Sequence, residues 1–184
     1  MIKNNLEYTS KKIDEIVDFT TENIEKPCGN TLSLTTDKWL FASKEKIEII
    51  SQVKAAKTDE IIEIKFNENN YFKSLNKILS ITDFEGENPV EFPKETEYKA
   101  FVKIPKSIAP IELRTRREGD IIQPFGSCGT MKLKKFLINK GIAEHKRDEI
   151  LLIAIRNEIL WAIGVGISEK LRSGEKPTHA IELR

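Results

Sequence analysis

The sequence predicts an α+β fold: an N-terminal amphipathic helix with a small antiparallel β-meander, then a C-terminal antiparallel sheet with one or two short helices. Apolar residues recur at helical spacing mainly near residues 10–26 and 131–140, and they alternate with a period of two over much of the remaining chain. The 184 residues, 39% of them hydrophobic, are enough for one sizeable core or two small ones. We therefore expect a folded protein.

The first predicted element is a helix that begins at Thr9 or Ser10 and ends before Pro27 and Gly29. Two interpretations of its apolar face stay open: it covers the core of the neighbouring strands, which we favour, or it contacts a partner domain. The positions at helical spacing are Ile13, Ile16, Val17, Thr20 and Ile24.

Short strands are predicted after this helix, because apolar residues alternate from Thr31 onward. Turn-forming residues at 85–89 and 93–94 then indicate a boundary near residue 95. We therefore expect a connecting or supporting domain at 1–95 and a basic domain at 96–184. The strands of the first domain are expected near 31–34, 39–41, 47–49, 61–66, 71–72 and 77–82.

The second domain is expected to centre on a β-hairpin, in which 150–155 pairs with 159–165 across Asn157-Glu158. Thr130 can cap the helix at 131–140, which Gly141 ends. Trp39 and Trp161 alternate with apolar neighbours, which predicts core positions. The other expected elements are strands at 97–104 and 111–116, a connection at 105–110, a helical turn at 145–147, a polar loop at 168–177 and a last strand at 178–184.

Charge is distributed unevenly along the chain, although the formal net charge is only +1. The first hundred residues have 14 lysines and no arginine against 19 acidic residues, whereas the rest has 16 basic residues against 10 acidic ones. Because the planar guanidinium group matches phosphate geometry, this predicts a basic binding half beside an acidic supporting half.

Neither metal binding nor a membrane location is predicted. Cys28 and Cys128 lie a hundred residues apart, which fits neither a disulfide framework nor a zinc site. No apolar run approaches the ~20 residues of a membrane span, and the N-terminus has no signal-peptide pattern. We therefore expect a cytoplasmic protein.

Residues 114–147 have the composition of a phosphate-binding segment. In a strand, Arg114 and Arg116 would point to one face, and we expect this pair to dominate binding. The lysines near the start of the 131–140 helix lie where the macrodipole disfavours cations, so a bound anion would complete the site. RNA phosphate is the expected anion. The predicted phosphate-binding residues are Arg114, Arg116, Arg117, Lys132, Lys134, Lys135, Lys146, Arg147 and Arg172.

Several of these residues have alternative interpretations. Arg114 can instead form an ion pair with Asp120, and we favour a structural lock made by Gly119 and Asp120 over a catalytic role for Asp120. His145 either donates to phosphate or caps its short helix. Cys128 lies near lysines but has no His-Asp partner within sequence reach, so catalysis by its thiol is not expected.

Five segments together resemble the C-terminal domain of tRNA(Ile)-lysidine synthetase, and they occur in the family's order and spacing. Thr9 to Ile50 is also similar to the connecting domain that precedes it in this family. Three residues depart from the family pattern. Cys128 and Met131 stand where the family more usually has small or basic residues, with lysine at Met131, and Gly166 replaces a more basic residue. The segments are Leu113-Arg-Thr-Arg-Arg-Glu-Gly-Asp120, Gln123-Pro-Phe-Gly126, Lys132-x-Lys134-Lys135-Phe136, Arg147-Asp148 and Ile159-Leu-Trp161-x-x-Gly164-x-x-Ile167-Ser168.

The resemblance implies an enzyme that uses ATP to attach lysine to the wobble cytidine of an isoleucine tRNA. It implies that C-terminal domains hold the tRNA and check its acceptor stem. The family's N-terminal domain carries a Ser-Gly-Gly-x-Asp-Ser type signature, which is absent from this sequence. We therefore expect a C-terminal fragment with no catalytic residues, no metal and no cofactor. ATP and Mg²⁺ are expected only in the N-terminal catalytic domain, which would be a partner of this chain together with tRNA.

The residues themselves leave two other functions open. The first is a protein-docking module that tethers a catalytic domain without touching RNA, which predicts weak and salt-insensitive RNA association. The second is a small hydrolase that uses Asp120 and His145, which predicts turnover by the chain alone.

Overall fold

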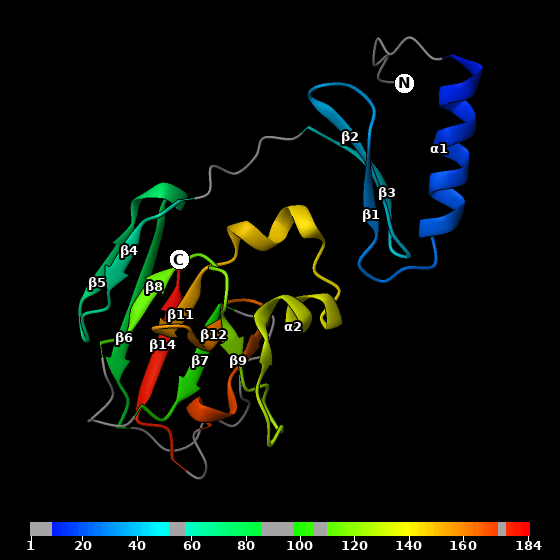
Figure 1. Cartoon of the computed structure of the whole chain (residues 1–184). Coiled ribbons are helices and arrows are strands. Elements are labelled where there is room, and N and C mark those ends of the chain that lie inside the picture. The colour runs from blue at the N-terminus through cyan, green and yellow to red at the C-terminus, as the bar shows by residue number, and fades with distance from the viewer. Residues whose placement is uncertain (1–8, 52–57, 86–97, 105–109, 173–175) are drawn as a thin grey trace. The chain divides into compact units, whose positions relative to one another are not determined.

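The computed structural model describes residues 9–51, 58–85, 98–104, 110–172 and 176–184, and the structural statements below refer to these residues (Figure 1). The chain divides into two compact units. The first unit comprises Met1–Ala56 and Gly141–Lys146, and the second comprises Lys57–Lys140 and Arg147–Arg184. Each unit is described by itself.

The first unit contains the predicted helix and meander. Helix α1 (Ser10–Asn23) is capped by Thr9, whose hydroxyl accepts from the backbone N–H of Lys12 at 3.3 Å. Strands β1 (Asn30–Ser33), β2 (Lys38–Ala42) and β3 (Ile47–Ser51) form an antiparallel sheet in the order β1-β2-β3. The predicted helix and meander are therefore confirmed. Trp39, predicted as a core residue, is only half-buried, and Ile13 and Val17 on the apolar face of α1 are exposed, which does not fit the favoured interpretation that this face covers the core of the strands.

A close backbone approach joins the end of α1 to the sheet of the first unit. Gly29 has a φ of +58°, a left-handed conformation that side chains disfavour. A Cβ atom at this position would lie 2.3 Å from the carbonyl oxygen of Ala42. The turn that leads into β1 therefore requires glycine for both conformational and steric reasons.

The larger sheet of the second unit includes three short strands, β8, β9 and β10, that bring parts of the basic segment 114–147 together (Figure 1). All its strand pairs are antiparallel except β9 with β12. Strands β11 and β12 form the predicted hairpin, and the turn between them places Arg156 at a φ of +56°. The order is β10 (Met131–Lys132), β9 (Ile121–Ile122), β12 (Glu158–Ala162), β11 (Leu152–Ile155), β8 (Glu112–Arg114) and β4 (Ile61–Glu63), with β13 (Gly166–Ile167) paired to β12.

A second, four-stranded antiparallel sheet shares one core with the first. Its order is β5 (Asn69–Phe72), β6 (Lys77–Asp83), β14 (His179–Leu183) and β7 (Lys99–Val102). The predicted last strand therefore exists as β14, but it lies in a different sheet from the β11–β12 hairpin. The common core includes Phe72, Leu79, Ile81, Val102, Leu113, Ile153, Trp161 and Ile181.

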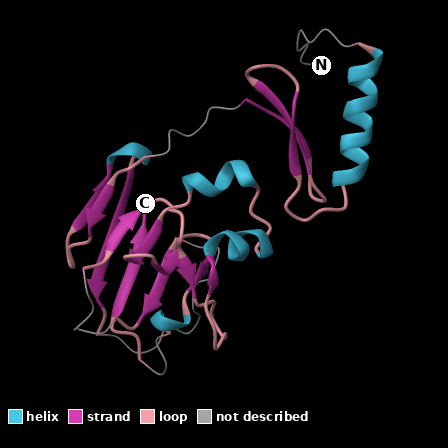
Figure 2. Cartoon of the chain, viewed as in Figure 1, coloured by secondary structure: helices cyan, strands magenta, loops and turns pink. Residues whose placement is uncertain are grey.

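Helices are short in the second unit (Figure 2). Helix α2 (Leu133–Asn139) buries Leu133, Phe136 and Leu137, as its spacing predicted. Short 3₁₀ turns of this unit are η1 (Lys73–Leu75) and η3 (Glu169–Leu171), and a further one, η2 (Glu144–Glu149), includes residues of both units. Over the ranges that the structure describes, no helix is long and apolar enough to cross a membrane.

Two details of the predicted organisation are wrong. Residues 61–83 were expected in the first domain, before the boundary near residue 95, but they belong to the second unit. In that unit β4 pairs with β8, and β6 pairs with β14. Residue 95 itself lies outside the described residues. Thr130 does not cap the helix, because 131–132 first form β10 and the helix begins at Leu133. The turn signals at 86–89 and 93–94 and the connection at 105–109 lie outside the described residues.

We expect Gly29→Ala to destabilise the first unit by about 1–3 kcal/mol, because alanine adds strain at positive φ and collides with the Ala42 carbonyl. Hydrogen–deuterium exchange of residues 30–51 would measure this and should become faster. Gly129→Ala is the control, because a Cβ there meets no atom within 4 Å and its φ is not positive. Equal exchange in both variants would contradict the prediction.

A pH dependence is expected for the four-stranded sheet. Burial lowers the pKa of His179 below its usual 6.5, although nearby Asp83 opposes the shift. Because the unfolded chain then binds the proton more readily, the stabilisation is complete above about pH 6.5 and is lost as the pH falls toward the folded pKa. Urea unfolding of the second unit between pH 7.5 and 5.5 should show this loss. His179→Gln should remove it, and His145→Gln, the change at the other histidine, should not.

Candidate functional site

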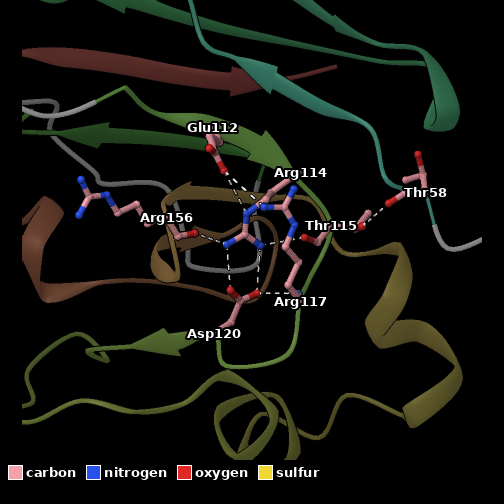
Figure 3. Close-up of polar contacts among 7 residues, drawn as sticks. All are labelled: Thr58, Glu112, Arg114, Thr115, Arg117, Asp120 and Arg156. Atoms are coloured by element: carbon pink, nitrogen blue, oxygen red, sulfur yellow. Dashed lines mark hydrogen bonds and ion pairs between the residues drawn. The ribbon is translucent and has the colours of Figure 1, made fainter.

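A buried ion pair lies at the centre of the basic segment (Figure 3). Arg114, at the end of β8, is 1% exposed, and Asp120 is 4% exposed. The guanidinium group donates from Nη1 to Asp120 Oδ2 at 3.0 Å and from Nη2 to Asp120 Oδ1 at 2.8 Å. Such a two-pronged pair has well-defined geometry as well as favourable charge. Arg114 therefore forms the ion pair with Asp120 that the sequence left open as the alternative to phosphate binding.

Further contacts tie this pair to neighbouring backbone. Arg114 also donates to the carbonyl oxygens of Thr115 and Arg156, and its Nε lies 3.4 Å from the Glu112 carboxylate. The Asp120 carboxylate additionally accepts from the backbone N–H of Arg117 at 2.7 Å. The pair therefore connects β8, the turn at 117–120 and the β11–β12 hairpin (Figure 3).

The predicted two-pronged arginine face is not present. Burial of Arg114 does not fit the prediction that it binds phosphate, because a phosphate could reach it only by breaking the pair with Asp120. Strand β8 ends at Arg114, so Arg116 lies beyond the strand, half-buried, with its Nε 2.5 Å from Asp148 Oδ1. Arg117 is exposed and only 3.9 Å from the Glu112 carboxylate. These two arginines remain accessible to a ligand.

The turn at 117–120 has the predicted tight form. Gly119 has a φ of +88°, and the Asp120 N–H approaches the Arg117 carbonyl at 3.4 Å. From this turn the Asp120 carbonyl accepts from the N–H of Leu133 at 2.8 Å. The start of α2 is thereby attached to the same turn as the buried pair.

A cavity of about 170 Å³ opens beside the arginines. Its walls combine guanidinium groups with carboxylates, and one carboxylate, Glu60, already accepts from the backbone N–H groups of Lys73 and Ser74. Because both positive and negative side chains line the cavity, its charge does not favour the binding of an anion. The lining residues are Thr58, Asp59, Glu60, Arg114, Thr115, Arg116, Arg117 and Glu118.

Three lysines form an exposed group at β10 and α2, which we call the lysine face: Lys132, Lys134 and Lys135. None of the three has an ion-pair partner among the described residues. Helix α2 has only seven residues, so the expected helix-dipole site for an anion is replaced by a simple exposed cationic surface. Gly166 approaches the Phe136 ring of α2 so closely that a Cβ would lie 2.8 Å from Cζ. A larger residue at position 166 would therefore require the Phe136 side chain to move.

The residues of η2 differ in exposure. Arg147 is only 6% exposed, which does not fit its predicted role in phosphate binding. Lys146 is exposed but belongs to the first unit, so its contribution stays a prediction. His145 packs its ring edge-on against Phe41 with centroids 5.1 Å apart, a structural contact that neither of its two predicted roles included.

The β9–β10 loop contains a residue that the sequence interpretation missed. Phe125 is 53% exposed, and the guanidinium carbon of Arg172 lies 5.5 Å from its ring centroid. The sequence signal was the aromatic residue within Gln123-Pro-Phe-Gly126, a turn-like segment with no periodicity. Arg172, predicted as a phosphate ligand, is 60% exposed and pairs with Glu169 at 2.9 Å.

We expect Asp120→Asn to lower the unfolding free energy of the second unit by about 1–3 kcal/mol, because buried Arg114 loses its charged partner. Asp120→Ala removes both acceptors and should cost about 3–5 kcal/mol. Asp148→Asn is the control, since its pair with Arg116 is partly exposed and should contribute about 1 kcal/mol or less. Urea unfolding measures all three. Equal losses for Asp120→Asn and Asp148→Asn would exclude the structural role.

Comparison with known proteins identifies this region. Residues 111–183 match the family model described as the TilS substrate C-terminal domain. A tRNA(Ile)-lysidine synthase from Caldanaerobacter subterraneus is 32% identical over 143 residues, which cover 71% of this chain and 31% of the relative. One from Clostridium acetobutylicum is 39% identical over 74 residues, which cover 40% of this chain and 16% of the relative.

The chain therefore spans about a third or less of the length of these relatives. A solved structure described as the crystal structure of TILS C-terminal domain has a TM-score of 0.52 and 24% identity, covering 68% of this chain and 94% of that one. This likeness supports the α+β fold. Together, these findings show that the chain is similar to the C-terminal region of tRNA(Ile)-lysidine synthases, and that its residues 111–183 match the model of the TilS substrate C-terminal domain.

Proposed function

We propose that the chain binds tRNA through exposed cations of the second unit, as the substrate-recognition part of a tRNA(Ile)-lysidine synthase. The observation that carries this proposal is the lysine face of Lys132, Lys134 and Lys135, three cations held without ion-pair partners among the described residues. They lie inside the segment that matches the TilS substrate C-terminal domain. Unpaired exposed cations can neutralise RNA phosphates and so release the counterions that are condensed on the RNA.

The proposed phosphate contacts follow from exposure. Lysines without a partner can turn to a phosphate at little cost, whereas a paired arginine must share its guanidinium group or exchange its carboxylate. Arg114 and Arg147 are omitted because both are buried. Lys146 lies in the first unit, so its phosphate contact is proposed separately and is not part of this interface. The proposed set in the second unit is Arg116, Arg117, Lys132, Lys134, Lys135 and Arg172.

The remaining parts of the proposal come from the relatives. Their name indicates an isoleucine tRNA as substrate and lysidine as product. We place the ATP- and Mg²⁺-dependent ligation to the wobble cytidine in the part of the relatives that this chain does not span, and contact with the acceptor-stem region here. The proposal implies a cytoplasmic protein whose second partner is that catalytic domain.

One observation favours the alternative of a docking module. Helix α1 leaves Ile13, Val17 and Ile24 largely exposed, although its own sheet is nearby. An apolar helix face of this kind suits a protein partner. Contact with the catalytic domain through α1 and contact with RNA through the lysine face are compatible, and salt dependence separates them.

We expect tRNA affinity to fall steeply with salt, by about a hundredfold or more between 50 and 200 mM if ~4–6 phosphates are contacted. Fluorescence anisotropy with an isoleucine tRNA and an unrelated tRNA would measure this. Lys134→Ala combined with Lys135→Ala should reduce the slope of log affinity against log salt by about two, for both tRNAs.

Lys77→Ala combined with Lys99→Ala is the matched control, because both lysines are exposed but lie in the four-stranded sheet. It should leave the slope nearly unchanged. Flat salt dependence of the unmodified chain, or an equal effect of both double variants, would overturn the proposed interface.

A further inference from the structure

An exposed aromatic ring and an exposed guanidinium group are held together outside the lysine face. Phe125 lies on the loop between β9 and β10, and Arg172 follows η3. The Arg172 guanidinium carbon is 5.5 Å from the Phe125 ring centroid, within the range of a cation–π contact. Both residues keep more than half of their side-chain surface exposed.

The pair is positioned by a shared carboxylate. Glu169 accepts from Arg172 Nη1 at 2.9 Å through one oxygen, and from the backbone N–H of Gly126 at 2.7 Å through the other. The Gly126 N–H and the Arg172 guanidinium both lower the pKa of Glu169, so it is ionised at neutral pH. One carboxylate thus holds the residue after Phe125 and the arginine that lies over its ring.

Backbone contacts attach the two segments to each other. The Glu169 N–H donates to the Gln123 carbonyl at 3.0 Å, and Pro124 forms a β-bridge with Ser168, which is fully buried. Anchors on both sides of Phe125 therefore fix the loop while its ring remains in solvent. A single exposed phenylalanine needs no explanation, but one fixed by surrounding contacts beneath an arginine has the form of a prepared binding surface.

The location links this pair to the proposed phosphate contacts. Loop 123–130 joins β9 to β10, and Lys132 pairs with Ile121 across the same two strands. Lys132 of the lysine face and Phe125 therefore belong to one β-hairpin, and the proposal places the bound RNA along this hairpin. Aromatic rings and guanidinium planes both stack on unpaired bases, whereas stacked bases within a duplex do not offer their faces.

We propose that Phe125 and Arg172 form a stacking platform for an unpaired nucleotide of the bound RNA. This inference rests on the proposed RNA-binding function and adds a contact to a base, in which the Phe125 ring contributes no charge and the Arg172 guanidinium group contributes its planar face as well as its charge. The lysine face holds a backbone, and the platform selects RNA in which a single-stranded base adjoins that backbone.

The test compares two RNA probes that share one double-stranded stem. One is blunt, and the other has a four-nucleotide unpaired 3′ extension that contains 2-aminopurine. The full chain should bind the extended probe about 5- to 150-fold more tightly, the range of one stacked base, and should quench its 2-aminopurine fluorescence. Phe125→Ala should abolish the preference and the quenching, with unchanged blunt-stem affinity and salt slope.

Two further variants separate stacking from charge. Phe125→Trp should keep the preference, because it retains an aromatic face. Arg172→Lys keeps the positive charge without the planar group and should weaken the preference at an unchanged salt slope. Exposed positions make misfolding unexpected, and thermal unfolding of each variant checks this.

The outcomes distinguish this inference from the proposed function. If the unmodified chain binds the blunt stem in a salt-dependent way but shows no preference for the extension, the platform is wrong and the phosphate interface stands. If neither probe binds at low salt, the proposed function fails. If Phe125→Ala leaves RNA binding unchanged but weakens association with an added catalytic domain, the ring is a protein contact and the platform is again wrong.

Discussion

The buried pair of Arg114 and Asp120 is the interaction on which the candidate site depends. Two ionised groups removed from water are tolerated only if each finds nearly all of its partners inside the protein. Arg114 meets this requirement with the Asp120 carboxylate and two backbone carbonyls, and Asp120 does so with Arg114 and the Arg117 N–H. Satisfying these groups fixes β8, the 117–120 turn and the hairpin turn at Arg156 together.

Arginine is suited to this position in a way that lysine is not. The N–H groups of its planar guanidinium point in several directions, so Arg114 can donate to both Asp120 oxygens and to two backbone carbonyls at once. A lysine ammonium has three N–H donors on a single nitrogen atom and could not reach all four acceptors. One carbonyl belongs to Arg156, a residue with positive φ, so the pair also holds a strained hairpin turn. The backbone N–H of Leu133 donates to the Asp120 carbonyl, and that of Ile121 donates to the Asn157 carbonyl. The starts of α2 and β9 are therefore attached to the same two turns that the buried pair holds.

The sequence predicted local elements well and their assembly less well. The hairpin at 152–162, the meander at 30–51 and the buried face of α2 follow from apolar periodicity, which short-range chemistry controls. Periodicity does not reveal which strands pair. The boundary predicted near residue 95 therefore placed β6 and β14 in different domains, although the two strands are paired in one sheet. Spacing likewise placed Arg114 and Arg116 on one face, but only tertiary packing decides that one is buried. Phe125 was missed because a turn-rich loop carries no period from which exposure can be judged.

Paired and unpaired charges divide the basic residues into two groups. In the second unit, the carboxylates of Glu112, Asp120, Asp148 and Glu169 each face an arginine. Much of the positive charge of these arginines is therefore neutralised by carboxylates within the fold. This does not fit the expectation that Arg114 and Arg116 would dominate phosphate binding.

The lysine face has no such partners among the described residues. Its charge is therefore the part left to attract a polyanion, even in a chain whose net charge is only +1. At physiological ionic strength a surface charge acts over about 8–10 Å, so a phosphate beside the lysine face would be attracted by this local group more than by the net charge of the chain. The pairing of carboxylates with arginines in the second unit therefore leaves these three lysines without a neutralising carboxylate among the described residues.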